Sequence, residues 1–173
     1  MAEPVKLSSG LEDLKVPAQP YVDSVPRVYV HAGQIHVTSA PCEISTIVGS
    51  CVAVFLWDER RGIAGCAHYL LPRWNGEGER TARYGNVALE LLLAGMKNNA
   101  AAMNNLKASV YGGGSVLNAL RTMAESLGKQ NCEAAMDILR TSCIPVVQQA
   151  VGGIKGRKIV FRTWNGATLL EEI

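Results

Sequence analysis

The chain has 173 residues, of which 48% are hydrophobic and 18% charged, a composition typical of a globular domain and unlike a disordered chain. A single domain of this length buries a sizeable core without disulfide or metal support. The formal net charge is +2, and both signs are mixed along the chain. Nothing therefore indicates the concentrated basic surface of a nucleic-acid-binding protein or a membrane-surface helix.

The N-terminus lacks the features of a targeting or membrane segment. Residues 1–15 contain no apolar stretch of the kind found in signal peptides, and the longest apolar run, at 87–94, is too short to cross a bilayer. The five cysteines are odd in number and form no CxxC pair, so neither a disulfide framework nor a zinc ribbon fits. We expect a cytoplasmic protein with reduced thiols and no membrane insertion.

The N-terminal part of the chain predicts an arm followed by strands. Residues 1–26, rich in Pro, Ser and charge, are expected to form a flexible arm before a single domain over 27–173. The first half of that domain is expected to contain these segments in order: a strand at 27–37 with a turn or bulge near Gly33, a strand at 43–58 interrupted at Gly49, a charged turn at 58–62, a strand at 63–72, and a polar loop at 73–80.

The second half mixes helical and strand patterns. Its expected elements are a helix from about 81 to 103, a strand at 106–111, a Gly-rich turn at 112–114, helices at 115–128 and 131–143, and strands at 144–152, 156–164 and 167–173. Ser115 and Asn131 are the expected N-caps of the two later helices, and Gly128 is the expected end of the first of them. This order predicts a mixed, layered α/β domain, with strands in mixed sheets flanked by about three helices.

Two reactive side chains lie in the apolar strands on either side of the charged turn. Cys51 follows a Gly-Ser pair, whose small residues let the backbone leave strand geometry and direct amide groups at a substrate. Pairing about the turn places Cys51 roughly opposite His68, with a register uncertainty of one or two residues. That arrangement is typical of a thiolate–imidazolium pair, in which the thiolate is the nucleophile.

Less specific interpretations remain open at this stage. Free cysteine is often a buried core residue, and a single histidine is often a hydrogen-bonded structural one. A metal site of Cys51, Cys66 and His68 is conceivable, but no fourth ligand is evident. The turn at 111–115 could cradle a phosphate, although no Walker A lysine follows it.

The motif sequences resemble those of one known family. "STIVGSCVAV" followed by "GIAGCAHYLLP" at this spacing is similar to the signature of CheD proteins, the chemoreceptor glutamine deamidases of bacterial chemotaxis. The likeness continues through "RYGNVALELLLAGM" and "LKASVYGGGSVL" and through the C-terminal third, covering about residues 30–170. Several independent segments agree in order and spacing, so the resemblance is specific. It implies a CheD-like cysteine hydrolase fold.

The resemblance assigns a role to each residue of the motif. Cys51 matches the family's nucleophile and His68 its general base. The third catalytic position, usually a threonine six residues before the cysteine, is Ser45 here, and Thr46 is an alternative hydroxyl that could orient the imidazole. Gly49 and Ser50 are then expected to shape the oxyanion side of the site, together with the amide of the cysteine itself.

The same resemblance implies an activity and its partners. The enzyme would convert glutamine side chains on the cytoplasmic helices of a chemoreceptor to glutamate through a thioester, with no metal or organic cofactor. A CheC-type chemotaxis phosphatase is an implied partner. Trp74, Gly112 and Gly113 are expected substrate or partner contacts. The competing interpretation is a docking module, non-catalytic or with a dual role, that binds the phosphatase and receptors.

Overall fold

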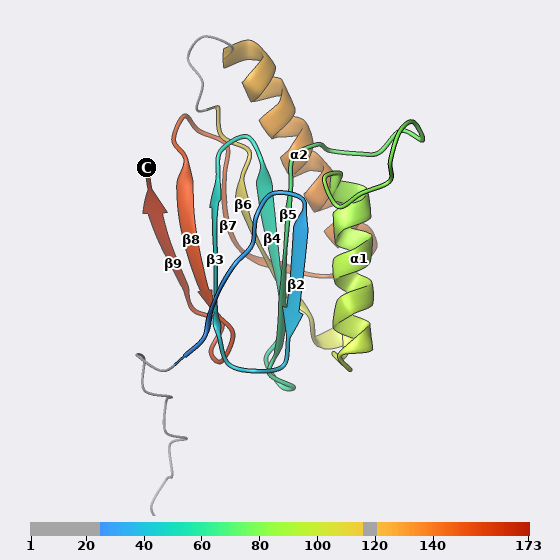
Figure 1. Cartoon of the computed structure of the whole chain (residues 1–173), viewed down its shortest axis with the longest axis vertical. Helices are drawn as coiled ribbons and strands as arrows, with labels where there is room; N and C mark the ends of the chain where they lie inside the picture. The colour runs from blue at the N-terminus through green and yellow to red at the C-terminus, as the bar shows by residue number, and fades with distance from the viewer. Residues whose placement is uncertain (1–24, 116–120) are drawn as a thin grey trace, which may run out of the picture.

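Two β-sheets stacked face to face, with helices on the far side of one of them, make up the part of the chain that the structure describes (Figure 1). The structure is a computed structural model and describes residues 25–115 and 121–173. The sheet without helices, called here the outer sheet, has the order β1 (Arg27–Tyr29), β3 (Glu43–Val48), β8 (Arg157–Arg162), β9 (Thr168–Glu172). The central sheet has the order β2 (Gln34–Thr38), β5 (Ile63–Tyr69), β4 (Val52–Asp58), β6 (Lys107–Gly112), β7 (Val146–Val151).

Both sheets are mixed, as the sequence predicts. In the outer sheet β1 runs parallel to β3, whereas the remaining pairs are antiparallel. In the central sheet β6 and β7 are parallel and the other pairs antiparallel. The helices α1 (Gly85–Asn98) and α2 (Arg121–Thr141) pack on the central sheet, and a short 3-10 helix, η2 (Met103–Asn105), precedes β6. The expected layered α/β class is confirmed.

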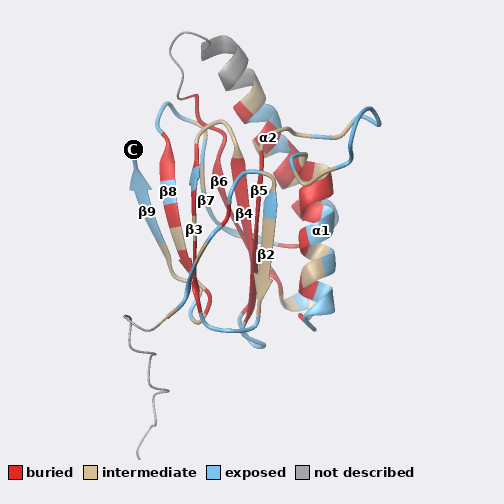
Figure 2. Cartoon of the chain, viewed as in Figure 1, coloured by how far each residue is buried: buried red, intermediate tan, exposed pale blue. Residues whose placement is uncertain are grey.

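The middle strands of the central sheet, β4, β5 and β6, are buried because they lie between the outer sheet and the helices (Figure 2). One apolar cluster fills the space between the sheets and includes Ile44, Phe55 and Phe161. A second cluster joins the central sheet to the helices and includes Leu56 and Leu92. This explains the nearly continuous apolar sequences of β4 and β5, since a strand covered on two sides has no polar face.

The chain changes sheets twice within segments that the sequence predicts as single strands. The break at Gly49 is real, but β3 belongs to the outer sheet and β4 to the central one, so the chain crosses between them in residues 49–51. A turn at Gly33 likewise separates β1 from β2, which lie in different sheets. The crossing at 49–51 places Cys51 at one end of the space between the sheets.

The helix boundaries expected at Gly128 and Asn131 are wrong. A single helix, α2, runs through both positions, so the described residues contain two α-helices where about three were expected. Gly128 is buried, and a Cβ there would lie 2.4 Å from the carbonyl oxygen of Gly113. Glycine therefore serves the close approach of the β6–α2 turn at this position and does not end the helix.

Two expectations lie outside the described residues. The arm predicted at 1–26 falls almost wholly in residues 1–24, and the helix start predicted after Ser115 falls in residues 116–120.

Candidate active site

Three strands from two sheets bring the candidate site residues together. Thr46 is on β3, His68 is near the end of β5, and Cys51 lies one residue before β4. In the β4–β5 ladder Ala53 is the partner of His68. Cys51 therefore lies diagonally across from His68, two residues from exact opposition and within the predicted register uncertainty. Diagonal neighbours in an antiparallel pair are roughly 7–8 Å apart, a separation that long and aromatic side chains such as that of His68 can bridge.

His68 is buried, and its Nδ1 atom is held by a hydrogen-bond network from the outer sheet. The Thr46 Oγ1 atom lies 2.9 Å from Nδ1 and 2.7 Å from the carbonyl oxygen of Val30. Because a carbonyl only accepts, the Thr46 hydroxyl donates to Val30 and its oxygen accepts the Nδ1–H. This assigns the proton to Nδ1 and leaves Nε2 as the basic nitrogen. Nε2 is buried and has no hydrogen-bond partner among the described residues.

The neighbouring hydroxyl, Ser45, has a different environment. Its Oγ atom lies 3.4 Å from the carbonyl oxygen of Val28, the donor being the hydroxyl. Successive residues of a strand point to opposite faces, so Ser45 faces away from the space between the sheets when Thr46 faces into it. Of the two hydroxyls considered from the sequence, the structure brings Thr46 to the imidazole and leaves Ser45 outside.

The electrostatics favour an uncharged pair in the free protein. Burial raises the pKa of the Cys51 thiol, an effect opposed by the residue's own backbone N–H. Burial also lowers the pKa of His68, opposed by the Val30 carbonyl. Both directions disfavour the thiolate–imidazolium pair expected from the sequence. A neutral thiol and a neutral imidazole suit a mechanism in which the histidine acts as a general base.

The turn between β3 and β4 is held from behind by the Gly-rich turn after β6. Gly114 N–H donates to the Gly49 carbonyl at 2.7 Å, and Gly113 N–H donates to the Cys51 carbonyl at 2.8 Å. A Cβ on Gly112 would lie 2.1 Å from that same Cys51 oxygen. These amides are therefore engaged with protein carbonyls, which argues against a phosphate cradle. Gly112 and Gly113 pack against the main chain of the candidate nucleophile.

The sequence of this chain matches a known protein family over more than half of its length. Residues 70–172 match the family model described as CheD chemotactic sensory transduction. The chain belongs to the CheD family. The resemblance noted in the sequence is thereby confirmed.

Individual CheD relatives match most of the chain. A protein of Trichlorobacter lovleyi, named "Probable chemoreceptor glutamine deamidase CheD", is 42% identical, and the match covers 83% of this chain and 89% of that protein. A protein of Anaeromyxobacter dehalogenans, named "Probable chemoreceptor glutamine deamidase CheD 1", is 41% identical, with 85% of each chain covered. Matches of this extent include the segment from Thr46 to His68, although the family model begins at residue 70.

One solved structure is a distant neighbour. The crystal structure of Bacillus licheniformis hypothetical protein YfiH gives a TM-score of 0.47 with 12% identity. The match covers 76% of this chain and 65% of that one, slightly less than two thirds. A likeness at this level has no bearing on function.

One buried residue of this CheD chain contacts the site without having been predicted to do so. Asn131, expected as a helix cap, lies within α2 and is fully buried. Its Nδ2 atom donates to the carbonyls of Ser50 and Leu70, both at 2.9 Å. No sequence signal distinguishes this asparagine from a capping one, because the contact joins residues far apart in the chain.

Trp74, an expected contact residue, is folded onto its own loop. Its indole N–H donates to the Glu77 carbonyl at 2.8 Å, and the Arg80 guanidinium lies over the ring, 5.8 Å from its centroid. The side chain is half-buried. The structure thus gives Trp74 a role in ordering the loop at 73–80, and its contact with a substrate stays a prediction.

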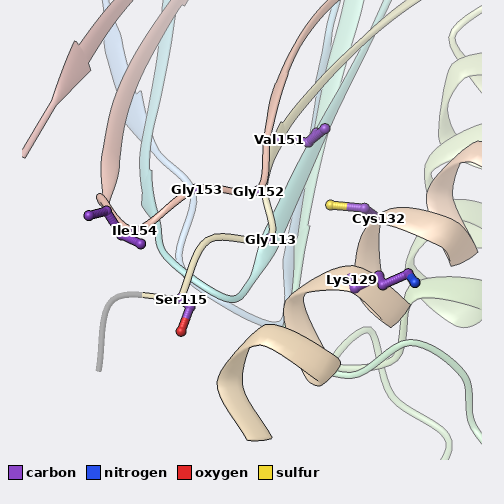
Figure 3. A pocket seen from close by; sticks show the side chains of 8 residues that line it. All are labelled: Gly113, Ser115, Lys129, Cys132, Val151, Gly152, Gly153 and Ile154. Carbon is purple, nitrogen blue, oxygen red and sulfur yellow. The ribbon is translucent and has the colours of Figure 1, made fainter. Parts of the chain in front are cut away.

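A pocket of about 450 Å³ lies behind the Gly-rich turn (Figure 3). It is formed by the β6–α2 segment, α2 and the turn after β7, and its lining residues are Gly113, Ser115, Lys129, Cys132, Val151, Gly152, Gly153 and Ile154. Cys51 and His68 are not among them.

Within residues 25–115 and 121–173 no three His, Cys, Asp or Glu side chains gather as a metal site would require. No described helix is long and apolar enough to cross a membrane.

Proposed function

We propose that this CheD chain is a chemoreceptor glutamine deamidase in which Cys51 is the nucleophile and His68 the general base. The supporting observation is the network from Val30 through Thr46 to His68, which leaves the basic Nε2 on the imidazole diagonally across from Cys51. The printed names of the relatives supply the reaction, because they describe chemoreceptor glutamine deamidases.

The reaction begins with proton transfer from the Cys51 thiol to His68 Nε2. The sulfur attacks the side-chain amide carbon of a receptor glutamine, and the carbonyl oxygen becomes an oxyanion. His68 then gives its proton to the departing nitrogen, releasing ammonia and leaving a thioester. Water attacks the thioester while His68 takes one of its protons, and collapse of this second intermediate releases glutamate and restores the thiol.

The oxyanion is stabilised by backbone donors at the β3–β4 turn. The proposed donor is the Cys51 N–H, which belongs to this turn and adjoins the sulfur to which the substrate carbon becomes bonded. Gly49 and Ser50 shape the turn that presents this amide. A donor that is already oriented stabilises developing charge without reorganisation, which is the usual basis of an oxyanion hole.

The substrate and setting follow from the same proposal. The glutamines lie on cytoplasmic helices of a methyl-accepting chemoreceptor, so the enzyme acts in the cytoplasm and changes chemotactic signalling by creating carboxylates. A CheC-type phosphatase is the proposed protein partner. The catalytic unit is the domain over residues 27–173.

The test is mass spectrometry of a receptor cytoplasmic fragment incubated with the protein in oxygen-18 water. Conversion of specific glutamines to glutamate with uptake of the heavy oxygen is expected for the wild type and for Cys143→Ala, which alters an exposed thiol. No conversion is expected for Cys51→Ala or His68→Ala. If the wild type converts no glutamine yet binds the receptor or a CheC-type phosphatase, the docking-module function is correct instead.

A further inference from the structure

The amide of Asn131 connects the two segments that hold the candidate nucleophile and base. Ser50, whose carbonyl it binds, immediately precedes Cys51. Leu70, whose carbonyl it also binds, comes two residues after His68 on the same segment of chain. Asn131 has no exposed surface. One side chain on α2 therefore links both halves of the site through hydrogen bonds of 2.9 Å.

The bond to Ser50 has a direct consequence for the Cys51 amide. The two groups belong to the same peptide unit, which is trans, so the Ser50 C=O and the Cys51 N–H point in opposite directions. Holding the carbonyl toward α2 directs the N–H away from α2. The peptide units on either side are fixed similarly, by Gly114 N–H on the Gly49 carbonyl and Gly113 N–H on the Cys51 carbonyl.

The rest of the contact fixes α2 itself against β5. Tyr69, the residue after His68, donates its hydroxyl to the main-chain carbonyl of Asn131 at 2.6 Å. The main-chain carbonyl of Asn131 thus accepts a hydrogen bond from β5, and its side-chain amide donates one to the carbonyl of Leu70, the residue that follows β5. Opposed bonds of this kind restrict sliding of the helix along the strand.

We propose that Asn131 is a positioning residue that orients the Ser50–Cys51 peptide so that the Cys51 N–H serves as the oxyanion donor. This inference rests on the proposed role of Cys51 as the nucleophile. Asn131 acts through that peptide and does not contact the substrate. Its removal should therefore harm reactions that pass through an oxyanion more than reactions of the same sulfur that do not.

Two small reagents separate these cases without a receptor. In acylation by p-nitrophenyl acetate, the Cys51 sulfur attacks the ester carbonyl through a tetrahedral oxyanion. Nitrophenolate leaves, and His68 receives the thiol proton. In alkylation by iodoacetamide, the sulfur displaces iodide from a saturated carbon, His68 again receives the thiol proton, and no oxyanion forms. Peptide mass spectrometry of the labelled protein assigns each rate to Cys51 among the five cysteines.

The measured quantity is the ratio of the acylation rate to the alkylation rate at Cys51. We expect the ratio to fall by about tenfold or more in Asn131→Ala, because loss of a full oxyanion donor costs about 10²–10³ in rate. Thr163→Val is the matched control. Thr163 is also a buried polar residue bridging backbone groups, those of Cys42 and Ala40, at the other end of β3. Its ratio should stay at the wild-type value.

An unchanged ratio in a folded Asn131→Ala protein, or an equal fall in Thr163→Val, overturns the inference. If Asn131→Ala does not fold by circular dichroism, Asn131→Ser is measured with the same criterion. Receptor deamidation by the wild type is recorded in parallel. Its absence would defeat the proposed function alone, since the ratio at Cys51 depends on neither a receptor nor a glutamine.

Discussion

At the scale of single residues, the site depends on which of two adjacent hydroxyls faces the space between the sheets. Thr46 reaches Nδ1 of His68, whereas Ser45 is bound to a carbonyl at the other face of β3. The Thr46 hydroxyl donates its proton to the Val30 carbonyl, and its oxygen accepts the Nδ1–H of the imidazole. It thus determines both the orientation of His68 and the nitrogen that is left basic.

Thr46→Val should lower kcat for receptor deamidation by roughly 10- to 100-fold, part of what a general base contributes in total. Valine has the same shape but cannot accept the Nδ1–H, so the tautomer with the basic Nε2 is no longer favoured. KM should change little, because Thr46 lies behind the histidine. Ser45→Ala is the control and should retain wild-type activity, and the reverse order of effects would show that Ser45 orients the base. Mass spectrometric rates over a range of receptor concentrations provide both constants.

The pH dependence of receptor deamidation should show that His68 stays neutral below the usual pKa of histidine. Burial lowers the pKa of His68, so protonation should remove activity only below the ordinary histidine value of about 6.5. The acid limb of kcat/KM, which reports the free enzyme, is therefore expected below that value. A limb at or above 6.5 would contradict a buried neutral His68. Circular dichroism at each pH is the control for unfolding, because burial lowers the pKa of His36 as well.

At the scale of elements, the Gly-rich turn after β6 is wedged between α2 and the β3–β4 turn. A Cβ on Gly113 would lie 2.2 Å from the Cys132 sulfur and 2.7 Å from the Gly128 carbonyl oxygen. A Cβ on Gly128, which belongs to α2, would in turn overlap the main chain of Gly113. The two glycines together allow the helix and the turn to approach closely enough for Gly113 to hold the Cys51 carbonyl.

Gly113→Ala and Gly152→Ala form a matched pair that separates backbone strain from steric overlap. Both glycines have left-handed backbones, with φ of +67° and +72°, but a Cβ on Gly152 would meet nothing within 4 Å. Gly152→Ala should cost only the strain of that conformation, about 1–2 kcal/mol. Gly113→Ala should cost about 1–3 kcal/mol more, the usual penalty of overpacking. Urea unfolding measures both, and equal costs would show that the turn is loosely packed.

At the scale of the whole molecule, a sandwich of two sheets places the reactive groups at one end of its interior. The chain crosses from outer to central sheet at residues 49–51, so Cys51 is only partly covered, whereas Cys66 lies deep between the sheets on β5. The same layering covers His68 and gives its environment a low polarity. A crossing at the end of a sandwich thus combines a buried His68, the proposed base, with a half-buried Cys51, the proposed nucleophile.

The thiols should react in an order that this layering predicts. Cys143 is exposed, Cys51 and Cys132 are partly buried, and Cys42 and Cys66 are buried. With Ellman's reagent we expect Cys143 to react first, Cys51 and Cys132 more slowly, and Cys42 and Cys66 only after unfolding. Quenched samples analysed by peptide mass spectrometry give the order, and guanidinium exposes every thiol as the control. Reaction of Cys66 in the native protein would contradict the stacking of the sheets.

Much of this organisation can be predicted from local patterns. The charged turn at 58–62 sets the pairing of β4 with β5, and counting outward from it places Cys51 within two residues of exact opposition to His68. Apolar, β-branched sequence predicts that strands such as β4 are buried on both faces. The break at Gly49 is visible in the sequence because glycine interrupts an otherwise continuous apolar run.

Other features depend on contacts between distant parts of the chain. The sequence pattern predicts that a helix ends at Gly128, yet the helix continues through it. The glycine is needed because the turn at Gly113, some fifteen residues earlier, packs against it. Asparagine is a residue type that commonly caps helices, so the sequence predicts a cap at Asn131. Only the packing of α2 on β5 shows that its side-chain amide donates to Ser50 and Leu70. A local pattern contains no information about such partners.

The sequence alone determined the strands of the central hairpin and placed Cys51 within two residues of exact opposition to His68, because both depend on residues close together around one turn. It also determined the CheD family, because the matching motifs occur in the same order along most of the chain. The tertiary structure decided that β3 and β4 belong to different sheets, and therefore that Thr46 and not Ser45 meets the imidazole. It also decided the burial that raises the pKa of the Cys51 thiol and lowers the pKa of His68, both of which favour the neutral forms. The physical reason is that the face of a strand, and the polarity around a side chain, are set by which sheet packs against which.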